Sequence, residues 1–200
     1  MSSQSFPKKD IFGKEIPVRV KISAKSLRDM FHPCTLGFIS KVCHAHCCET
    51  SLTEQHTLIA IAPFEQPRIE SLGGVVKNGI LQTPNKRCTF KNDQNLCSIH
   101  EKGQPLGCSI SPFTFTKNGN TLIVRNRYRR LRCWRAKGAK PAYKAHRRSL
   151  EILFGAEKTE EIAQHLDKGG GDLVVEMDRE IFARLRGNDE SRFAALKVVE

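Results

Sequence analysis

Eight cysteines constrain what this chain can fold into more than any other feature of its sequence. They are Cys34, Cys43, Cys47, Cys48, Cys88, Cys97, Cys108 and Cys133. The N-terminal residues contain no apolar segment and no small-residue cleavage site, so we expect a cytoplasmic protein with reduced thiols. A chain of 200 residues can also bury a core without disulfide bonds. Metal binding is therefore the expected role of these cysteines.

The surroundings of the cysteines favour metal ligation over burial as free thiols. The flanking residues are polar and rich in turns, as at His44, His46 and Asp93, whereas free cysteines usually lie among apolar residues. Thiolates are soft ligands that suit Zn²⁺ or iron–sulfur clusters, and a cation offsets their mutual repulsion. The adjacent Cys47 and Cys48 cannot easily share one tetrahedral site, but they can point to opposite sides of the backbone. One could then ligate while the other packs or serves a second metal.

Four segments around the cysteines carry a recognisable pattern. Their sequences are CHAHCCE at 43–49, LTE at 52–54, CTFKNDQNLCSIH at 88–100 and QPLGCSISPF at 104–113. Together with Cys34, these segments resemble the CxxCxxCC family. That family includes the YkgJ-type zinc- or iron-chelating domains and the cysteine-rich part of flagellin lysine N-methylases. The resemblance covers about residues 34–113.

The resemblance implies seven metal ligands. They are Cys34, Cys43, Cys47, Cys48, Cys88, Cys97 and Cys108. The family usually begins with C-x2-C-x2-C-C, whereas this chain has gaps of eight and three residues, and the three-residue gap is like that of the flagellin methylases. Gln104 and Ser109 stand where the family often has arginine. We therefore expect an arginine that faces the substrate or the cluster to be missing from this chain.

The number of thiols limits the choice of cofactor. Seven or eight thiolates are too many for one tetrahedral zinc. The expected cofactor is therefore either an iron–sulfur cluster, of the [4Fe–4S] type with extra structural cysteines, or two Zn²⁺ ions. Cys133 lies outside the family match. It either completes a set of eight thiolates for two four-ligand sites or is a half-buried free thiol, and the sequence leaves both alternatives open.

A second feature is the strongly basic segment 125–148. It carries 11 arginines and lysines and no carboxylate, in a chain whose net charge is +12. Aromatic residues between the cations add stacking faces, so nucleic acid or another acidic macromolecule is a candidate partner. The candidate contacts are Arg125, Arg127, Arg129, Arg130, Arg132, Trp134 and Arg135. The alternative is a solvated face that the acidic residues of 149–200 neutralise in part, and no known nucleic-acid-binding motif occurs in the sequence.

The local patterns predict an α+β fold. Alternation of apolar and basic residues predicts a strand over 16–22, and Ser23 or Ser26 is expected to cap a short helix. Asn-Gly pairs predict hairpins over 75–82 and 113–124. Helices are expected near Thr53, over 68–74 and from 141 onward, with Gly155 as a stop. No stretch of the sequence is long and apolar enough to cross a membrane.

These patterns divide the chain into three regions. Residues 1–15 are expected to form a flexible arm, 16–135 a small cysteine-rich, metal-centred domain with short β-hairpins, and 136–200 a helical C-terminal segment. The leading hypothesis is a cysteine-ligated metalloprotein, with an iron–sulfur cluster favoured over zinc, that takes part in a modification reaction on a macromolecule. The alternative is a non-enzymatic zinc module that binds nucleic acid through 125–148. The sequence identifies no catalytic residue and leaves enzymatic activity open.

Overall fold

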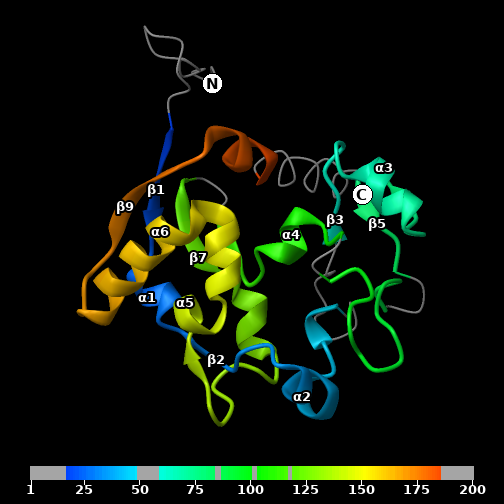
Figure 1. The fold of residues 1–200 in the computed structure, drawn as a ribbon, viewed down its shortest axis with the longest axis horizontal. Coiled ribbons are helices and arrows are strands. Elements are labelled where there is room, and N and C mark those ends of the chain that lie inside the picture. The colour runs from blue at the N-terminus through cyan, green and yellow to red at the C-terminus, as the bar shows by residue number, and fades with distance from the viewer. Residues whose placement is uncertain (1–16, 49–58, 84–86, 101–102, 117–118, 186–200) are drawn as a thin grey trace, which may run out of the picture.

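The computed structural model describes residues 17–48, 59–83, 87–100, 103–116 and 119–185 (Figure 1). The predicted N-terminal arm and the helix start at Thr53 lie outside these residues. The described part of the chain mixes short sheets with helices, which confirms the α+β class. None of the described helices combines the length and the apolar character needed to cross a membrane.

A four-stranded sheet forms the larger half of the molecule, and the predicted N-terminal strand is one of its two central strands. This strand, β1 (Val18–Ile22), buries Val20 and Ile22 completely and turns its basic residues outward, as the alternation predicts. It pairs in parallel with β7 (Thr121–Val124) and antiparallel with β9 (Leu173–Met177). The fourth strand, β6 (Phe113–Phe115), pairs with β7, so the order is β6-β7-β1-β9.

Both predicted hairpins are present. The hairpin predicted over 113–124 joins β6 to β7. The hairpin predicted over 75–82 joins β4 (Val76–Lys77) to β5 (Ile80–Leu81) through Asn78 and Gly79, whose φ angles are 51° and 69°. Asn and Gly adopt such left-handed angles at the lowest cost, which is why this pair marks a tight turn. A third short strand, β3 (Ile59–Ala60), pairs with β5 and completes a small sheet of order β3-β5-β4.

Helices cover the four-stranded sheet. Ser23 caps α1 (Ala24–Leu27), and its side chain accepts a hydrogen bond from the Ser26 backbone N–H. Near the other end of the chain lie α5 (Ala142–Ala145) and α6 (Arg147–Asp167). Gly155, with φ 78° and ψ 167°, breaks α6 where the sequence predicted a stop. Buried residues of α6 such as Leu150 and Ile162 pack in the same core as Val20.

The C-terminal region contains a strand as well as helices. Although 136–200 was predicted to be helical, Leu173–Met177 form β9, which pairs along the whole of β1. Its alternate residues Val175 and Met177 are buried in the core that α6 and β1 share. The boundary predicted at residue 135 therefore divides elements that pack in one hydrophobic core.

A second, smaller core lies apart from the first. Its buried residues are Ile61, Ile69, Leu81, Cys88, Phe90 and Ile99. They come from the small sheet, from α3 (Gln66–Ser71) and from the loop that follows residue 87. We call the core around β1 the main core and this one the small core. Figure 1 shows α3, β3 and β5 on one side of the molecule, β1, β9 and α6 on the other, and α4 (Leu106–Ser109) between them.

Short elements connect the two cores. The chain leaves β2 (Met30–Phe31), which pairs with β8 (Lys140–Pro141), and continues into α2 (Leu36–Phe38), the π-helix η1 (Ile39–Cys43) and the 3₁₀ helix η2 (His46–Cys48). A further 3₁₀ helix, η4 (Asn126–Arg130), follows β7. The cysteines lie on these connecting elements and on the loops beside them.

Candidate metal centre

The adjacent cysteines lie at the boundary between the two cores. Cys47 packs against the main core, whereas Cys48 packs against the small core. Their sulfur atoms are 3.9 Å apart. The two residues therefore contact different cores, although their sulfur atoms are close enough to share a hydrogen bond.

An unusual backbone turn precedes Cys47 and Cys48 and sets their position. The π-helix η1 ends at His44, and both His44 and Ala45 have left-handed φ angles, of 50° and 48°. Such angles are uncommon for residues other than glycine and cost free energy, so the surrounding structure must hold them. Backbone hydrogen bonds from His44 N–H to the Ile39 carbonyl and from Cys48 N–H to the Ala45 carbonyl, both 2.8 Å, close the turn.

The second cysteine group is tied directly to the first. The Cys88 backbone N–H donates to the Cys48 carbonyl at 3.2 Å. Between Cys88 and Cys97 the chain folds back on itself, with a bridge between Lys91 and Cys97 and a left-handed Asn95 at φ 64°. This return places Cys97 beside Cys88, and the side chain of Lys91 becomes buried with an exposed fraction of 7%.

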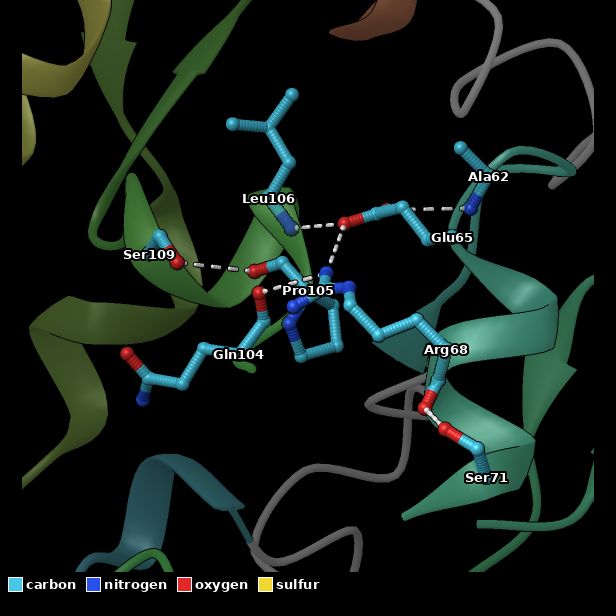
Figure 2. Close-up of polar contacts among 8 residues, drawn as sticks. All are labelled: Ala62, Glu65, Arg68, Ser71, Gln104, Pro105, Leu106 and Ser109. Atoms are coloured by element: carbon cyan, nitrogen blue, oxygen red, sulfur yellow. Dashed lines mark hydrogen bonds and ion pairs between the residues drawn. The ribbon is translucent and has the colours of Figure 1, made fainter. Parts of the chain in front are cut away.

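Helix α4, which carries Cys108, is anchored at its N-terminus by a buried carboxylate (Figure 2). Glu65 is 2% exposed, and its Oε1 accepts hydrogen bonds from the Leu106 backbone N–H at 2.7 Å and from Arg68 Nη2 at 3.3 Å. Its Oε2 accepts one from the Ala62 backbone N–H at 3.3 Å. Arg68 also donates to the Gln104 carbonyl at 3.4 Å. These contacts fix the start of α4 to α3 of the small core.

The far end of α4 is fixed to the main core instead. The Ser149 hydroxyl of α6 lies 2.9 Å from the carbonyl oxygens of both Ser109 and Ser111. Cys108 is therefore held between two anchors, one in each core. The Gln104 side chain hydrogen-bonds to the Cys97 sulfur and lowers its pKa, although burial raises that pKa overall. Gln104 thus contacts a candidate ligand.

Burial and mutual repulsion keep most of these thiols protonated in the absence of a metal. Burial raises the pKa of Cys108 and of Cys133 to about 12. The pKa of Cys34 is also raised to about 12, by burial first and then by the charges of Cys47, Cys133 and Cys43. The pKa of Cys47 is lowered to about 7, because the Cys48 thiol donates a hydrogen bond to it. A cation bound here would have to displace protons from these thiols.

Three basic side chains supply positive charge to the thiols. Burial raises the pKa of Cys43 and of Cys88, and the charge of Lys91 opposes that rise in both. Burial likewise raises the pKa of Cys108, and Arg125 opposes it. The lowered pKa of Cys47 is due first to the Cys48 thiol, with Arg127 and Lys91 acting in the same direction. A group of thiolates carries several negative charges, and nearby cations offset them.

A cavity of roughly 750 Å³ opens beside the cysteines. Six of the eight line it, namely Cys34, Cys47, Cys48, Cys88, Cys97 and Cys108. The wall also contains five cationic side chains, Arg68, Lys91, Arg125, Arg127 and Arg148, and its described residues include no Asp or Glu. His146 contributes a buried Nε2 that has no hydrogen-bond partner within the described residues, and burial lowers its pKa to about 4. The cavity is therefore a positively charged space next to the thiols.

The thiols are gathered but not yet in a coordination geometry. Among the described residues, no three His, Cys, Asp or Glu side chains already stand in positions that could hold a metal ion. All eight cysteines are free thiols. Binding of a metal would therefore have to draw the side chains together, which is common because metal binding and folding are coupled.

Most of the predicted nucleic-acid contacts face other parts of this chain. Arg125 and Arg127 lie in the cavity wall. Arg129 forms an ion pair with Asp29 at 2.6 Å, and Arg132 donates to the Val42 carbonyl at 3.0 Å. The guanidinium of Arg135 lies 4.6 Å from the ring centroid of Trp134, and Arg130 is exposed. The nucleic-acid contacts stay a prediction.

Several residues of the site carry no signal in the sequence. Glu65 and His146 reach it only through tertiary packing, far from any cysteine in the chain. Lys91 could have been noticed as the basic residue between Cys88 and Cys97.

Comparison of the chain with family models, curated proteins and solved structures finds no match. The likeness to the CxxCxxCC family therefore remains a prediction.

Proposed function

We propose that this chain is a cysteine-ligated metalloprotein whose main centre is an iron–sulfur cluster that serves a modification reaction on a macromolecule. The observation that carries the proposal is the cavity beside the thiols. All of Cys48, Cys88, Cys97 and Cys108 line it. Four thiolates are the usual ligand set of a [4Fe–4S] cluster.

The chemistry of the surrounding residues fits such a group. A [4Fe–4S] centre with four thiolates carries a net charge of about −2 in its oxidised form, which a buried site must offset. Lys91 and Arg125 supply positive charge to thiols of this set. The hydrogen bond from Gln104 to the Cys97 sulfur is of the kind that tunes the reduction potential of a cluster.

The open cavity favours a cluster over a structural zinc ion. Structural zinc sites are closed, with four protein ligands and no free space beside them. The volume here, roughly 750 Å³, lies in the range of ligand-binding pockets, about 300–1,000 Å³. A group of a substrate could therefore approach the centre. The type of reaction rests on the resemblance to the cysteine-rich part of flagellin lysine N-methylases.

Anaerobic purification of the full-length protein tests the proposal. The protein should be brown, absorb broadly near about 400 nm and contain iron and sulfide. Cys97→Ser should abolish this absorbance, whereas Ser98→Ala, at the exposed neighbouring position, should leave it unchanged. Colourless protein that contains zinc and no iron would overturn the iron–sulfur assignment.

The alternative, a zinc module that binds nucleic acid through 125–148, has less support. Its strongest observation is the excess of 11 cations over no carboxylates in that segment. Several of these cations already contact groups of the same chain, as Arg129 does with Asp29. Binding of labelled DNA or RNA that weakens steeply with salt would favour this alternative.

A further inference from the structure

Cys133 lies outside the family pattern, yet the structure ties it to the first cysteine group at two points. Its carbonyl accepts a hydrogen bond from the His32 backbone N–H at 2.8 Å, and His32 is two residues before Cys34. The preceding residue, Arg132, donates from Nη1 to the Val42 carbonyl at 3.0 Å, and Val42 is the residue before Cys43. Two independent contacts thus bring Cys133 to the segments that carry Cys34 and Cys43.

The packing of the adjacent cysteines separates the eight thiols into two sets. Cys47 packs against the main core, which contains Cys133. Cys48 packs against the small core, which contains Cys88 and lies against Cys97. The border between the sets therefore passes between Cys47 and Cys48.

We infer that Cys34, Cys43, Cys47 and Cys133 form a second tetrathiolate site, which binds one Zn²⁺ ion. This inference rests on the proposed function in assigning Cys48, Cys88, Cys97 and Cys108 to the other centre. It assigns Cys133 as a ligand and divides the seven cysteines of the family pattern between two centres.

The two sites differ in their access to the cavity. All four cysteines of the first site line it, but only Cys34 and Cys47 of the second do so, and Cys43 and Cys133 are not among its described lining residues. Cys133 is also buried, with an exposed fraction of 9%. A tetrathiolate set that is partly turned away from a cavity suits a closed structural zinc site. This ion would join the segment 34–47 to the main core near residue 133.

The competing interpretation is that Cys133 is a free thiol in the main core. A buried cysteine can fill space as a small hydrophobe without binding anything. The two interpretations differ in their prediction for metal content. If Cys133 only packs, then Cys133→Ser changes stability but leaves the zinc content at the wild-type value.

Metal analysis of the full-length protein, purified anaerobically, tests the inference. Wild-type protein should contain about one zinc per chain in addition to the iron of the cluster. Cys133→Ser should lower the zinc content by about tenfold or more, because three thiolates no longer complete the tetrahedral site, and should leave the iron and sulfide content unchanged. Cys97→Ser should do the reverse, removing iron while zinc stays.

A second variant covers the case in which Cys133→Ser does not fold. Cys34 is exposed as a whole residue, although its thiol in the cavity wall is desolvated, and serine is close to cysteine in size. Cys34→Ser therefore removes little packing and should lower zinc by the same factor. Iron without zinc in the wild type, or zinc that survives both substitutions, would overturn the second site while the cluster stands. Two zinc ions and no iron, with one lost in Cys133→Ser, would support the second site and overturn the cluster. Protein without any metal would overturn both proposals.

Discussion

The two cores of this molecule differ in how many apolar side chains they bury. Among the residues that the structure describes, the main core buries 22 in one cluster, drawn from strands and helices far apart in the sequence. The small core buries six of the described residues. A hydrophobic core of six side chains is too small to offset the conformational entropy of its segments, and small domains of this kind usually need a metal or disulfides. Under the proposed function, the metal centre supplies the stability that burial of apolar surface supplies in the main core.

Removal of the proposed metal should unfold the small core and leave the main core folded, and this is the largest effect we expect. Treatment with a strong chelator under reducing conditions should abolish amide hydrogen-exchange protection at Ile61, Ile69 and Leu81. Even one structural Zn²⁺ contributes about 10–16 kcal/mol to the folding of a zinc-finger peptide, so loss of a four-thiolate centre should unfold a core of this size. Protection at Val20 and Leu122 of the main core should persist. Simultaneous loss in both cores would show that they form one cooperative unit.

The anchor between the cores gives a second way to test their difference. Glu65→Gln removes the buried carboxylate charge and leaves one amide oxygen to accept from Ala62, Arg68 and Leu106. We expect a loss of about 1–3 kcal/mol in the stability of the small core and faster release of iron to a chelator. The matched control is Glu70→Gln on the same helix, where the exposed carboxylate accepts from the Gln66 side chain. Equal iron-release rates in the two variants would contradict the role of Glu65 in holding α4.

The sequence predicted local structure well and tertiary contacts poorly. Strand β1 and both hairpins follow from patterns of a few residues, alternation in one case and Asn-Gly pairs in the other. Strand β9 was not predicted, although its alternate residues are buried. It follows a long helix and a run of glycines, and the whole region was interpreted as helical. The adjacency of Cys47 and Cys48 suggested that they serve different surroundings, and they pack against different cores. The anchoring by Glu65 and the placement of His146 depend on contacts between distant segments, which no local pattern encodes.

Mild acid should destabilise the main core through His146, and this is the smallest effect that we expect. Burial lowers the pKa of His146 to about 4, below its ordinary value of 6.5, so the unfolded state binds the proton more readily between these values. The stability contributed by neutral His146 is therefore present above pH 6.5 and is lost as the pH falls toward 4. Between pH 7 and pH 5.5 the loss is about 1 kcal/mol.

Denaturant unfolding at the two pH values measures this loss. The His146→Phe variant keeps an aromatic ring beside Phe31 and Phe113 and should lose about 1 kcal/mol less than the wild type between pH 7 and pH 5.5. Hydrogen exchange should place the wild-type effect in the main core. An identical pH dependence in wild type and variant would show that other groups cause it.

The pairing of β1 also determines the order in which the chain can fold during its synthesis. Strand β1 pairs with β7, about a hundred residues later, and along its full length with β9, about 150 residues later. The ribosome must therefore make residues 173–177 before the sheet is complete, and contacts of such long sequence separation form slowly. By that time all eight cysteines have been synthesised. The segments that carry the proposed metal ligands are thus complete before β9 is available to finish the sheet.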